Sequence, residues 1–170
     1  MSCSSHLESK ILYAMEEYFA GDTLRILHAH RVLQYAKEIL EEEGGNREII
    51  IPAAILHDIG IKECETKYNS SNGQLQEKEG PPIAGKILQG FHMNEAIISE
   101  VCQIISSHHS PGELNSLNFK ILWDADWLVN LKDEYDIRDK KKLKNVIEKI
   151  FFTESGKIKA REIYIKNENQ

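Results

Sequence analysis

The chain has 170 residues, of which 41% are hydrophobic and 28% charged, and its formal net charge is -6. This length suits one domain with its own core, and the hydrophobic fraction excludes a wholly disordered chain. The acidic balance argues against a protein that coats nucleic acid through lysine and arginine, so we expect no polymeric nucleic-acid partner.

Apolar residues recur every three or four positions along most of the chain, which is typical of amphipathic helices. Glycines at 21, 44–45 and 60 are expected to end the first three helices. The predicted helices are Leu7–Phe19, Asp22 or Thr23 to Glu43, Arg47–Ile59, Ile83–Phe91, Asn94–Ser107, Leu117–Leu131 and Arg138–Phe152. Because no alternating pattern is long enough for a sheet, we predict an all-α bundle of about seven helices.

Two segments do not show clear helical periodicity. Residues 62–82 are polar and rich in Asn, Ser, Gly and Glu, so we expect a long loop, and such loops are often functional. Residues 153–170 form a C-terminal extension in which 158–165 could be a short helix or a strand, with a frayed end at 167–170. The prediction is therefore one domain over 1–170, with its core at about 22–152.

The sequence gives no sign of a membrane or secreted protein. No run approaches the roughly 20 apolar residues that a spanning helix needs, and the first residues lack the pattern of a secretory signal. The three cysteines, Cys3, Cys64 and Cys102, are too widely spaced to indicate a disulfide framework or a zinc knuckle. We therefore expect a cytoplasmic protein without a membrane partner.

Ionisable side chains interrupt the apolar stripes of several predicted helices. They are His28, the pair His57 and Asp58 after the apolar run 49–56, His108, Asp124 and Asp126. His28, for example, shares the inner face of its helix with Leu24 and Val32. Burial of such groups costs free energy unless they are paired or bind a metal. Imidazole and carboxylate ligands suit Mn, Fe, Co, Ni or Zn, so we predict a site for one divalent transition metal ion.

Three ordered segments resemble the HD-domain superfamily of metal-dependent phosphohydrolases, whose signature is H…HD…D. The segments are 25–32 (RILHAHRV), 55–60 (ILHDIG) and 121–128 (ILWDADWL). The resemblance implies a helical bundle of the HD type. It also implies that the metal ligands are His28, His57, Asp58 and Asp126.

The first ligand position has a competitor in His30. In the family pattern, the histidine is followed three and four residues later by a basic residue and Val, and Arg31 and Val32 select His28. His30 lies about 200° around the helix from His28, which favours a surface position.

The last ligand position also has a competitor, Asp124. The A-D-x-L form of the family selects Asp126 and leaves Asp124 either beside the ligands or on the surface. Trp127 stands where many relatives have Arg, which could remove a charge near the site.

The resemblance also bears on the number of metal ions. Members with two metals usually carry a further histidine before the helix predicted here at 83–91, and residues 79–82 contain none. This departure favours a single ion and disfavours the di-iron oxygenase branch. The segment 110–112 likewise lacks the longer glycine-rich signature of the cyclic-dinucleotide phosphodiesterases.

Other residues could contact a substrate phosphate. His108, Lys62 and Arg31 are candidates for binding it, and Asp58, His108 and Lys62 for catalysis, with Asp58 both binding metal and orienting water. The alternatives are a solvated loop for Lys62, a surface position for Arg31, and loop capping for His108 and His109. The sequence leaves these alternatives open.

The resemblance implies hydrolysis of a phosphate ester by a metal-activated water, with a nucleotide or another small phosphomonoester as substrate. The main alternative is a non-catalytic HD protein that binds a metal or a nucleotide. A di-iron oxygenase of the same fold is less favoured. The expected partner is a small phosphorylated molecule, and a homodimer is compatible with the sequence.

Overall fold

The structure, a computed structural model, describes residues 3–110 and 112–166. Over these residues it contains nine α-helices, one π-helical turn and no strand, which confirms the all-α prediction. The elements are α1 (Cys3–Phe19), α2 (Thr23–Glu43), α3 (Arg47–Leu56), α4 (Ile61–Tyr68), α5 (Gly73–Gly90), α6 (Glu95–Ile105), α7 (Leu117–Glu134), α8 (Lys140–Ile150), α9 (Glu154–Arg161) and the π-helical turn η1 (Glu162–Lys166).

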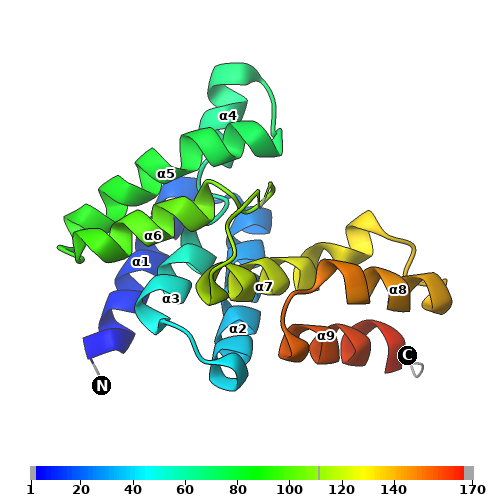
Figure 1. The fold of residues 1–170 in the computed structure, drawn as a ribbon. Coiled ribbons are helices and arrows are strands. Elements are labelled where there is room, and N and C mark those ends of the chain that lie inside the picture. Colours follow the sequence, from blue (N-terminus) through cyan, green and yellow to red (C-terminus); the bar gives the residue numbers. More distant parts are fainter. Residues whose placement is uncertain (1–2, 111, 167–170) are drawn as a thin grey trace.

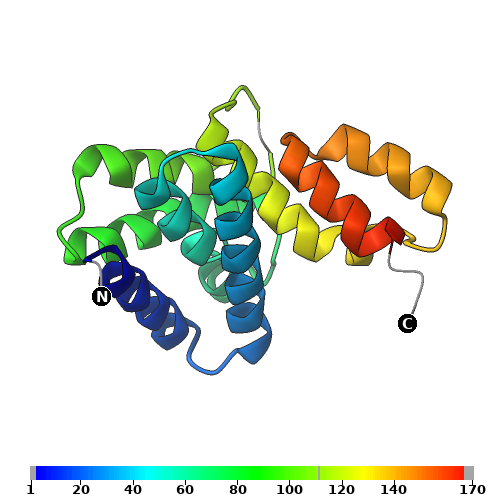
Figure 2. The ribbon, with the colours of Figure 1, turned by 90° about the horizontal axis from the view of Figure 1, so that it is seen from below.

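Helices α2, α3 and α7 form the centre of the bundle. Helix α2 packs along both α7 and α3, and α3 also contacts α6 and α1. Figures 1 and 2 show α8 and α9 beyond α7, on the side of the molecule away from α1. Helix α7 therefore joins the central bundle to the C-terminal helices.

Helix α2 begins and ends where its capping residues predict. The side chain of Asp22 accepts a hydrogen bond from the backbone N–H of Arg25, and Gly44 follows the last turn with φ of 79°. Leu24, which the periodicity places on the inner face, is 82% exposed. It lies in the first turn of α2, and the buried residues of this helix begin only at Ala29.

Helix α3 is apolar all round and buried from residue 49 to residue 56. It ends at Leu56, before the predicted end at Ile59, and a turn leads to α4 at Ile61. His57 and Asp58 therefore lie in this turn rather than inside a helix. Two adjacent side chains can point to one centre there, because the regular 100° rotation is relaxed.

The prediction of a loop at 62–82 is wrong, because this segment forms α4 and most of α5. Glu79 links the two helices, since its carboxylate accepts from Lys67 Nζ at 2.7 Å and from the Tyr68 hydroxyl at 2.8 Å. A Cβ atom on Gly60 would lie 2.7 Å from the backbone of Gly80, so the chain can pass this closely only with glycine. These contacts between distant residues stabilise helices that their polar composition does not predict.

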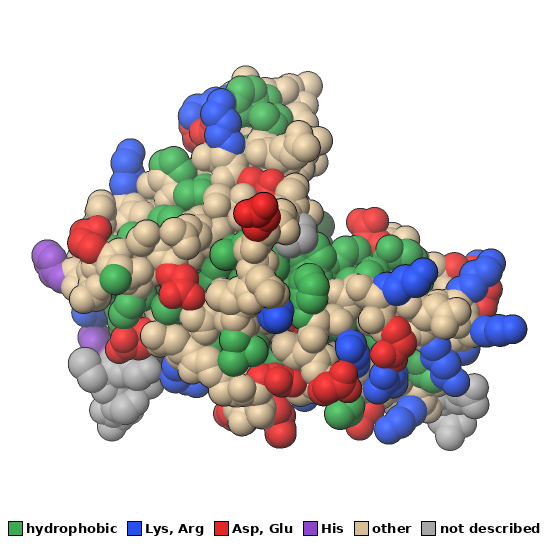
Figure 3. Space-filling view, viewed as in Figure 1, with side chains coloured by type: hydrophobic (Ala, Val, Ile, Leu, Met, Phe, Trp, Pro, Cys, Tyr) green, Lys and Arg blue, Asp and Glu red, His purple; other side chains and the backbone are tan. Residues whose placement is uncertain are grey.

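The C-terminal extension is helical, with α9 and η1 in place of the alternative strand. Residues 167–170, predicted to be frayed, lie outside the described residues. Figure 3 shows Lys and Arg side chains gathered over α8 and α9, with acidic side chains among them. Among the described residues, no helix combines the length and the apolar character that crossing a bilayer requires.

Candidate metal centre

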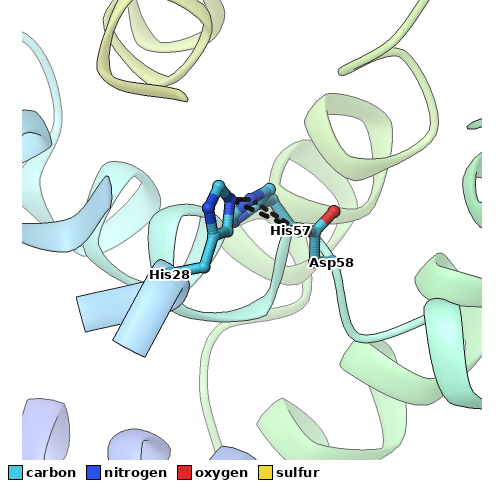
Figure 4. A group of neighbouring side chains, drawn as sticks. All are labelled: His28, His57 and Asp58. Carbon is cyan, nitrogen blue, oxygen red and sulfur yellow. Dashed lines mark hydrogen bonds and ion pairs between the residues drawn. The ribbon is translucent and has the colours of Figure 1, made fainter. Parts of the chain in front are cut away.

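The four side chains predicted as metal ligands converge from α2, the turn after α3, and α7. His28 Nε2 lies 3.1 Å from His57 Nε2, 3.1 Å from Asp126 Oδ1 and 3.4 Å from Asp58 Oδ2. Figure 4 shows the facing rings of His28 and His57, with the carboxylate of Asp58 beside them. Residues far apart in sequence thus present nitrogen and oxygen atoms to one centre.

His57 is held in one orientation by the helix that precedes it. Its Nδ1 lies 2.9 Å from the carbonyl oxygen of Ala54 and donates a hydrogen bond to it. The proton is therefore on Nδ1, and Nε2 faces the cluster, 3.3 Å from Asp58 Oδ2 and 3.6 Å from Asp126 Oδ1. A backbone acceptor of this kind commonly fixes the tautomer of a metal-binding histidine.

The charges of the cluster compensate one another. Burial by itself lowers the pKa of His57, but Asp58 and Asp126 outweigh it and hold that pKa well above its usual value. Burial by itself raises the pKa of Asp58, but His57 and His108 hold it well below its usual value. Despite its burial, Asp126 has a lowered pKa because of His28 and His57. Both carboxylates are therefore anionic, and they attract a positive charge to the centre.

The donor set suits a divalent transition metal ion. Ligand atoms of His28, His57 and Asp58 all lie within 4.8 Å of one another, and Asp126 adds a second carboxylate beside His28. Two imidazoles and two carboxylates match the nitrogen and oxygen ligands that Zn, Fe, Co, Ni and Mn accept. The cluster can therefore hold one such ion through residues of three separate elements.

His108 lies next to these four residues and repeats the arrangement of His57. Its Nδ1 donates to the carbonyl oxygen of Ile105 at 2.7 Å, and its Nε2 lies 3.4 Å from Asp58 Oδ1. The His109 ring packs on it with centroids 4.0 Å apart. Asp58, His108 and His109 form a second group of potential metal ligands that shares Asp58 with the first.

The family model for the HD domain matches residues 25–131 of this chain, which include all four converging residues. The chain belongs to the HD-domain family. The match confirms the resemblance that the three sequence segments indicate. It ends within α7, so α8, α9 and η1 lie outside the matched part of this HD domain.

Two solved structures share its fold. A predicted HD superfamily hydrolase from an uncultured Thermotogales bacterium is 26% identical, covers 96% of this chain and 91% of its own, and superposes with a TM-score of 0.70. An HD-superfamily hydrolase from Bacillus thuringiensis is 21% identical, covers 96% of this chain and 93% of its own, and has a TM-score of 0.65. No curated protein matches. The chain therefore has the fold of the HD-superfamily hydrolases over nearly its whole length.

The HD domain contains a further polar residue at the centre, Asn130, which is not among the predicted site residues. Asn130 Nδ2 donates to Asp126 Oδ1 at 2.8 Å from one turn further along α7. The spacing of four residues, which places the amide and the carboxylate on one helix face, is the signal that could have found it. Asn130 orients Asp126 toward the histidines.

The predicted phosphate contacts of Lys62 and Arg31 are not brought to the centre. Lys62 Nζ donates to the carbonyl oxygen of Tyr18 at 2.8 Å and lies over the Tyr18 ring. Arg31 is exposed on α2. His30 pairs with Glu16 at 2.7 Å and does not join the four converging residues. Of the predicted phosphate contacts, His108 alone lies against the cluster.

Asp124 occupies neither of the two places that the sequence suggests. It is fully buried, so it is not a surface residue, and it faces the start of α9 rather than the histidines. Its carboxylate accepts hydrogen bonds from the backbone N–H groups of Phe152 and Thr153 and from the Thr153 hydroxyl. Burial raises its pKa to about 6, although these hydrogen bonds oppose the change.

Proposed function

We propose that this HD domain is a metal-dependent phosphohydrolase that acts on a small phosphomonoester, such as a nucleotide. The observation that carries the proposal is the convergence of His28, His57, Asp58 and Asp126 on one centre. The side chains of His28 and Asp58 are 20% and 18% exposed, whereas that of His57 is 1% exposed. One side of the centre thus faces solvent, and an open side distinguishes catalytic metal sites from closed structural ones.

The residues around the centre divide the chemical work. A divalent ion held by these residues would supply a water of lowered pKa and would neutralise a phosphate oxygen. Asp58 presents Oδ2 to the ligand histidines and Oδ1 to His108, so the same carboxylate can orient an attacking water and accept its hydrogen bond. His108 Nε2 faces Asp58 at 3.4 Å and so lies where it can contact a substrate phosphate bound at the centre.

The distribution of cations around the site favours a small substrate. Lys62 is bound to Tyr18 and Arg31 is exposed to solvent, so neither of these two cations adds a positive charge at the centre. A polymeric nucleic acid needs a row of lysines and arginines to neutralise successive phosphates. A single phosphate group needs only the metal and one or two donors such as His108.

A second hypothesis, that the site holds two metal ions, follows from the group formed by Asp58, His108 and His109. These residues could hold a second ion that shares Asp58 with the first. A count of bound metal per chain distinguishes the two hypotheses, since loss of one of two ions in His109→Ala supports the second ion. One ion per chain in both proteins supports the single-metal hypothesis.

The proposal can be tested with a panel of phosphorylated metabolites and Mn²⁺, Co²⁺ or Zn²⁺. We expect a phosphomonoester to be hydrolysed by the wild-type protein and the rate to fall by at least about 100-fold in His28→Ala, because that variant loses a metal ligand. His30→Ala is the matched control, since His30 lies on the same helix but pairs with Glu16 on the surface.

Two outcomes would contradict the proposal. If wild-type protein with metal bound hydrolyses no member of the panel above the rate of His28→Ala, the chain is instead a non-catalytic metal-binding HD protein. If His30→Ala and His28→Ala lose activity equally, the activity does not come from this centre.

A further inference from the structure

We infer that Asp124 is a positioning residue that sets the place of Asp126 by anchoring α7 to the first turn of α9. The inference rests on the proposed metal site, because Asp126 is one of its ligands. It assigns to the C-terminal helices, outside the part matched by the family model, a role in the geometry of the metal centre.

The anchor is a buried carboxylate with three donors. Asp124 Oδ1 accepts from Phe152 N at 2.8 Å, and Oδ2 accepts from Thr153 N at 2.7 Å and from Thr153 Oγ1 at 2.6 Å. Asp124 is 0% exposed and Thr153 is 5% exposed, so water does not compete for these bonds. Three hydrogen bonds from two adjacent residues onto one buried carboxylate fix α7 against the start of α9.

The start of α9 is shaped to receive the carboxylate. Thr153 is the N-cap of α9. Its Oγ1 accepts a hydrogen bond from Gly156 N at 3.0 Å, and the same hydroxyl donates a hydrogen bond to Asp124. A Cβ atom at position 156 would overlap Asp124 Oδ2, so a glycine is needed for this approach. The Thr153 hydroxyl therefore binds the Asp124 carboxylate, and the glycine at 156 leaves the space that this carboxylate occupies.

Asp124 lies two positions before Asp126 on α7, with only Ala125 between them. Asp124 and Asp126 point about 200° apart around α7, so one faces α9 and the other faces His28. Two more bonds tie α7 to the C-terminal segment, from Trp123 Nε1 to Ile150 O at 3.0 Å and from the Tyr164 hydroxyl to Leu128 O at 2.6 Å. They flank Asp126 in the sequence, so a shift of α7 against α9 moves Asp126 relative to His28.

The experiment compares Thr153→Val with Thr153→Ser in the full chain. Valine keeps the size of the side chain but removes the hydroxyl donor, whereas serine restores it. We expect Co²⁺ to bind Thr153→Val roughly 3- to 10-fold more weakly than wild type, at or below the lower end of the losses caused by removing an outer hydrogen-bond partner. We also expect the visible absorption spectrum of bound Co²⁺ to change in Thr153→Val and to be restored in Thr153→Ser.

A control separates positioning from general stability. Leu143→Ala removes a buried side chain of α8 and so destabilises the C-terminal helices without touching Asp124. We expect it to lower the urea midpoint while the Co²⁺ affinity and spectrum stay as in wild type. In the metal-free proteins, we expect faster hydrogen exchange at amides 125–130 in Thr153→Val than in Thr153→Ser.

The outcomes distinguish this inference from the proposed function. Wild-type Co²⁺ affinity, spectrum and exchange rates in Thr153→Val would overturn the positioning role and leave the metal site standing. An equal loss of Co²⁺ affinity in Leu143→Ala would also overturn it, because stability alone would then explain the effect. Failure of the wild-type protein to bind Co²⁺ would instead overturn the metal site.

Discussion

At the scale of single residues, the centre depends on two histidines that follow apolar helices. His57 and His108 each donate from Nδ1 to the carbonyl oxygen three residues earlier, Ala54 in one case and Ile105 in the other. Each bond turns Nε2 toward Asp58. A buried helix end thus supplies an acceptor that holds a proton on Nδ1 and fixes the orientation of the ring before any ligand binds.

The amide of Asn130 gives a prediction at this scale. Because Asn130 Nδ2 donates to Asp126 Oδ1 at 2.8 Å, Asn130→Ala frees the carboxylate to rotate. We expect metal affinity to fall about 10-fold, as for other residues that orient a ligand. Isothermal titration with Co²⁺ or Mn²⁺ measures this, and Asn145→Ala on the exposed face of α8 is the control. Unchanged affinity in Asn130→Ala would show that the histidines alone hold Asp126.

The sequence predicts the residues that meet at the centre better than those that support it. His28, His57, Asp58 and Asp126 stand out because polar groups on apolar stripes are unusual and match an ordered motif. The role of Asp124 depends on Thr153, nearly thirty residues further on, and no local pattern marks that pairing. Asn130 shows only a spacing of four residues, which many surface helices share.

At the scale of elements, the turn after Asp58 passes very close to α5 at Gly60. One added Cβ atom at this position would disturb the packing. A Cβ on Gly60 would meet the backbone of Gln76 and Gly80 at 2.7 Å, and backbone cannot move aside as a flexible side chain can. We expect Gly60→Ala to lower the free energy of unfolding by about 2 kcal/mol, as for other overpacked sites. Urea unfolding measures the loss.

A matched variant is available in α5 itself. A Cβ atom on Gly90 would have no atom of a neighbouring residue within 4 Å, and Gly90 has no positive φ, so Gly90→Ala should leave stability unchanged or raise it slightly. Equal midpoints for Gly60→Ala and Gly90→Ala would refute the close approach. A loss of metal affinity in Gly60→Ala alone would further show that the turn carrying Asp58 has moved.

The elements around this turn also show where sequence patterns fail. Helix α2 is correctly predicted because Asp22 and Gly44 mark its ends locally. The segment 62–82 is wrongly predicted as a loop because its polar residues and its two prolines are typical of loops. Its helices depend on two tertiary contacts. Glu79 of α5 accepts a hydrogen bond from Lys67 of α4, and the backbone of Gly80 lies close to Gly60.

The contact between η1 and α7 leads to a prediction for alkaline pH. Tyr164 is 8% exposed and donates its hydroxyl to Leu128 O, and burial, with Tyr35 and Asp133, raises its pKa to about 12. A raised pKa means that the folded state favours the neutral phenol. The stabilisation is therefore complete below pH 10 and is lost as the pH rises from 10 to 12.

Comparison with Tyr164→Phe isolates this effect from the titration of lysines. At pH 8 we expect the phenylalanine variant to be less stable by about 1 kcal/mol, since Leu128 O loses its partner. Between pH 10 and 12 the difference between the two proteins should shrink and then reverse. Urea midpoints across this range measure it, and a constant difference would mean that the hydroxyl is not buried as described.

At the scale of the whole molecule, the net charge of -6 is an average over two unlike parts. Residues 1–134 contain eleven basic and twenty-one acidic side chains, whereas residues 135–170 contain ten basic and six acidic ones. The acidic part contains the candidate metal centre, and the basic part forms the helices beyond α7 (Figure 3). Electrostatic arguments about partners therefore need the charge of each part rather than the total.

If the proposed site binds a metal ion, the ion should stabilise the whole fold, because the four candidate ligands come from α2, the turn after α3, and α7. An ion that binds only the folded state at 100 times its Kd adds about 2.7 kcal/mol. For a chain of this size, we expect the melting temperature to rise by roughly 5–10 °C with Mn²⁺ or Co²⁺ and to return to its starting value with a chelator.

The size of this rise, rather than the starting melting temperature, is the informative quantity. His57→Ala changes the metal-free protein too, since Asp58 and Asp126 lose their compensating partner. We expect the metal-dependent rise to disappear in His57→Ala and to persist in His92→Ala, an exposed histidine in the turn between α5 and α6. An equal rise in both variants would mean that the ion binds at another site. His57→Ala removes one of the ligands through which an ion at this centre would connect α2, the turn after α3, and α7, so binding at this centre could not give the full rise.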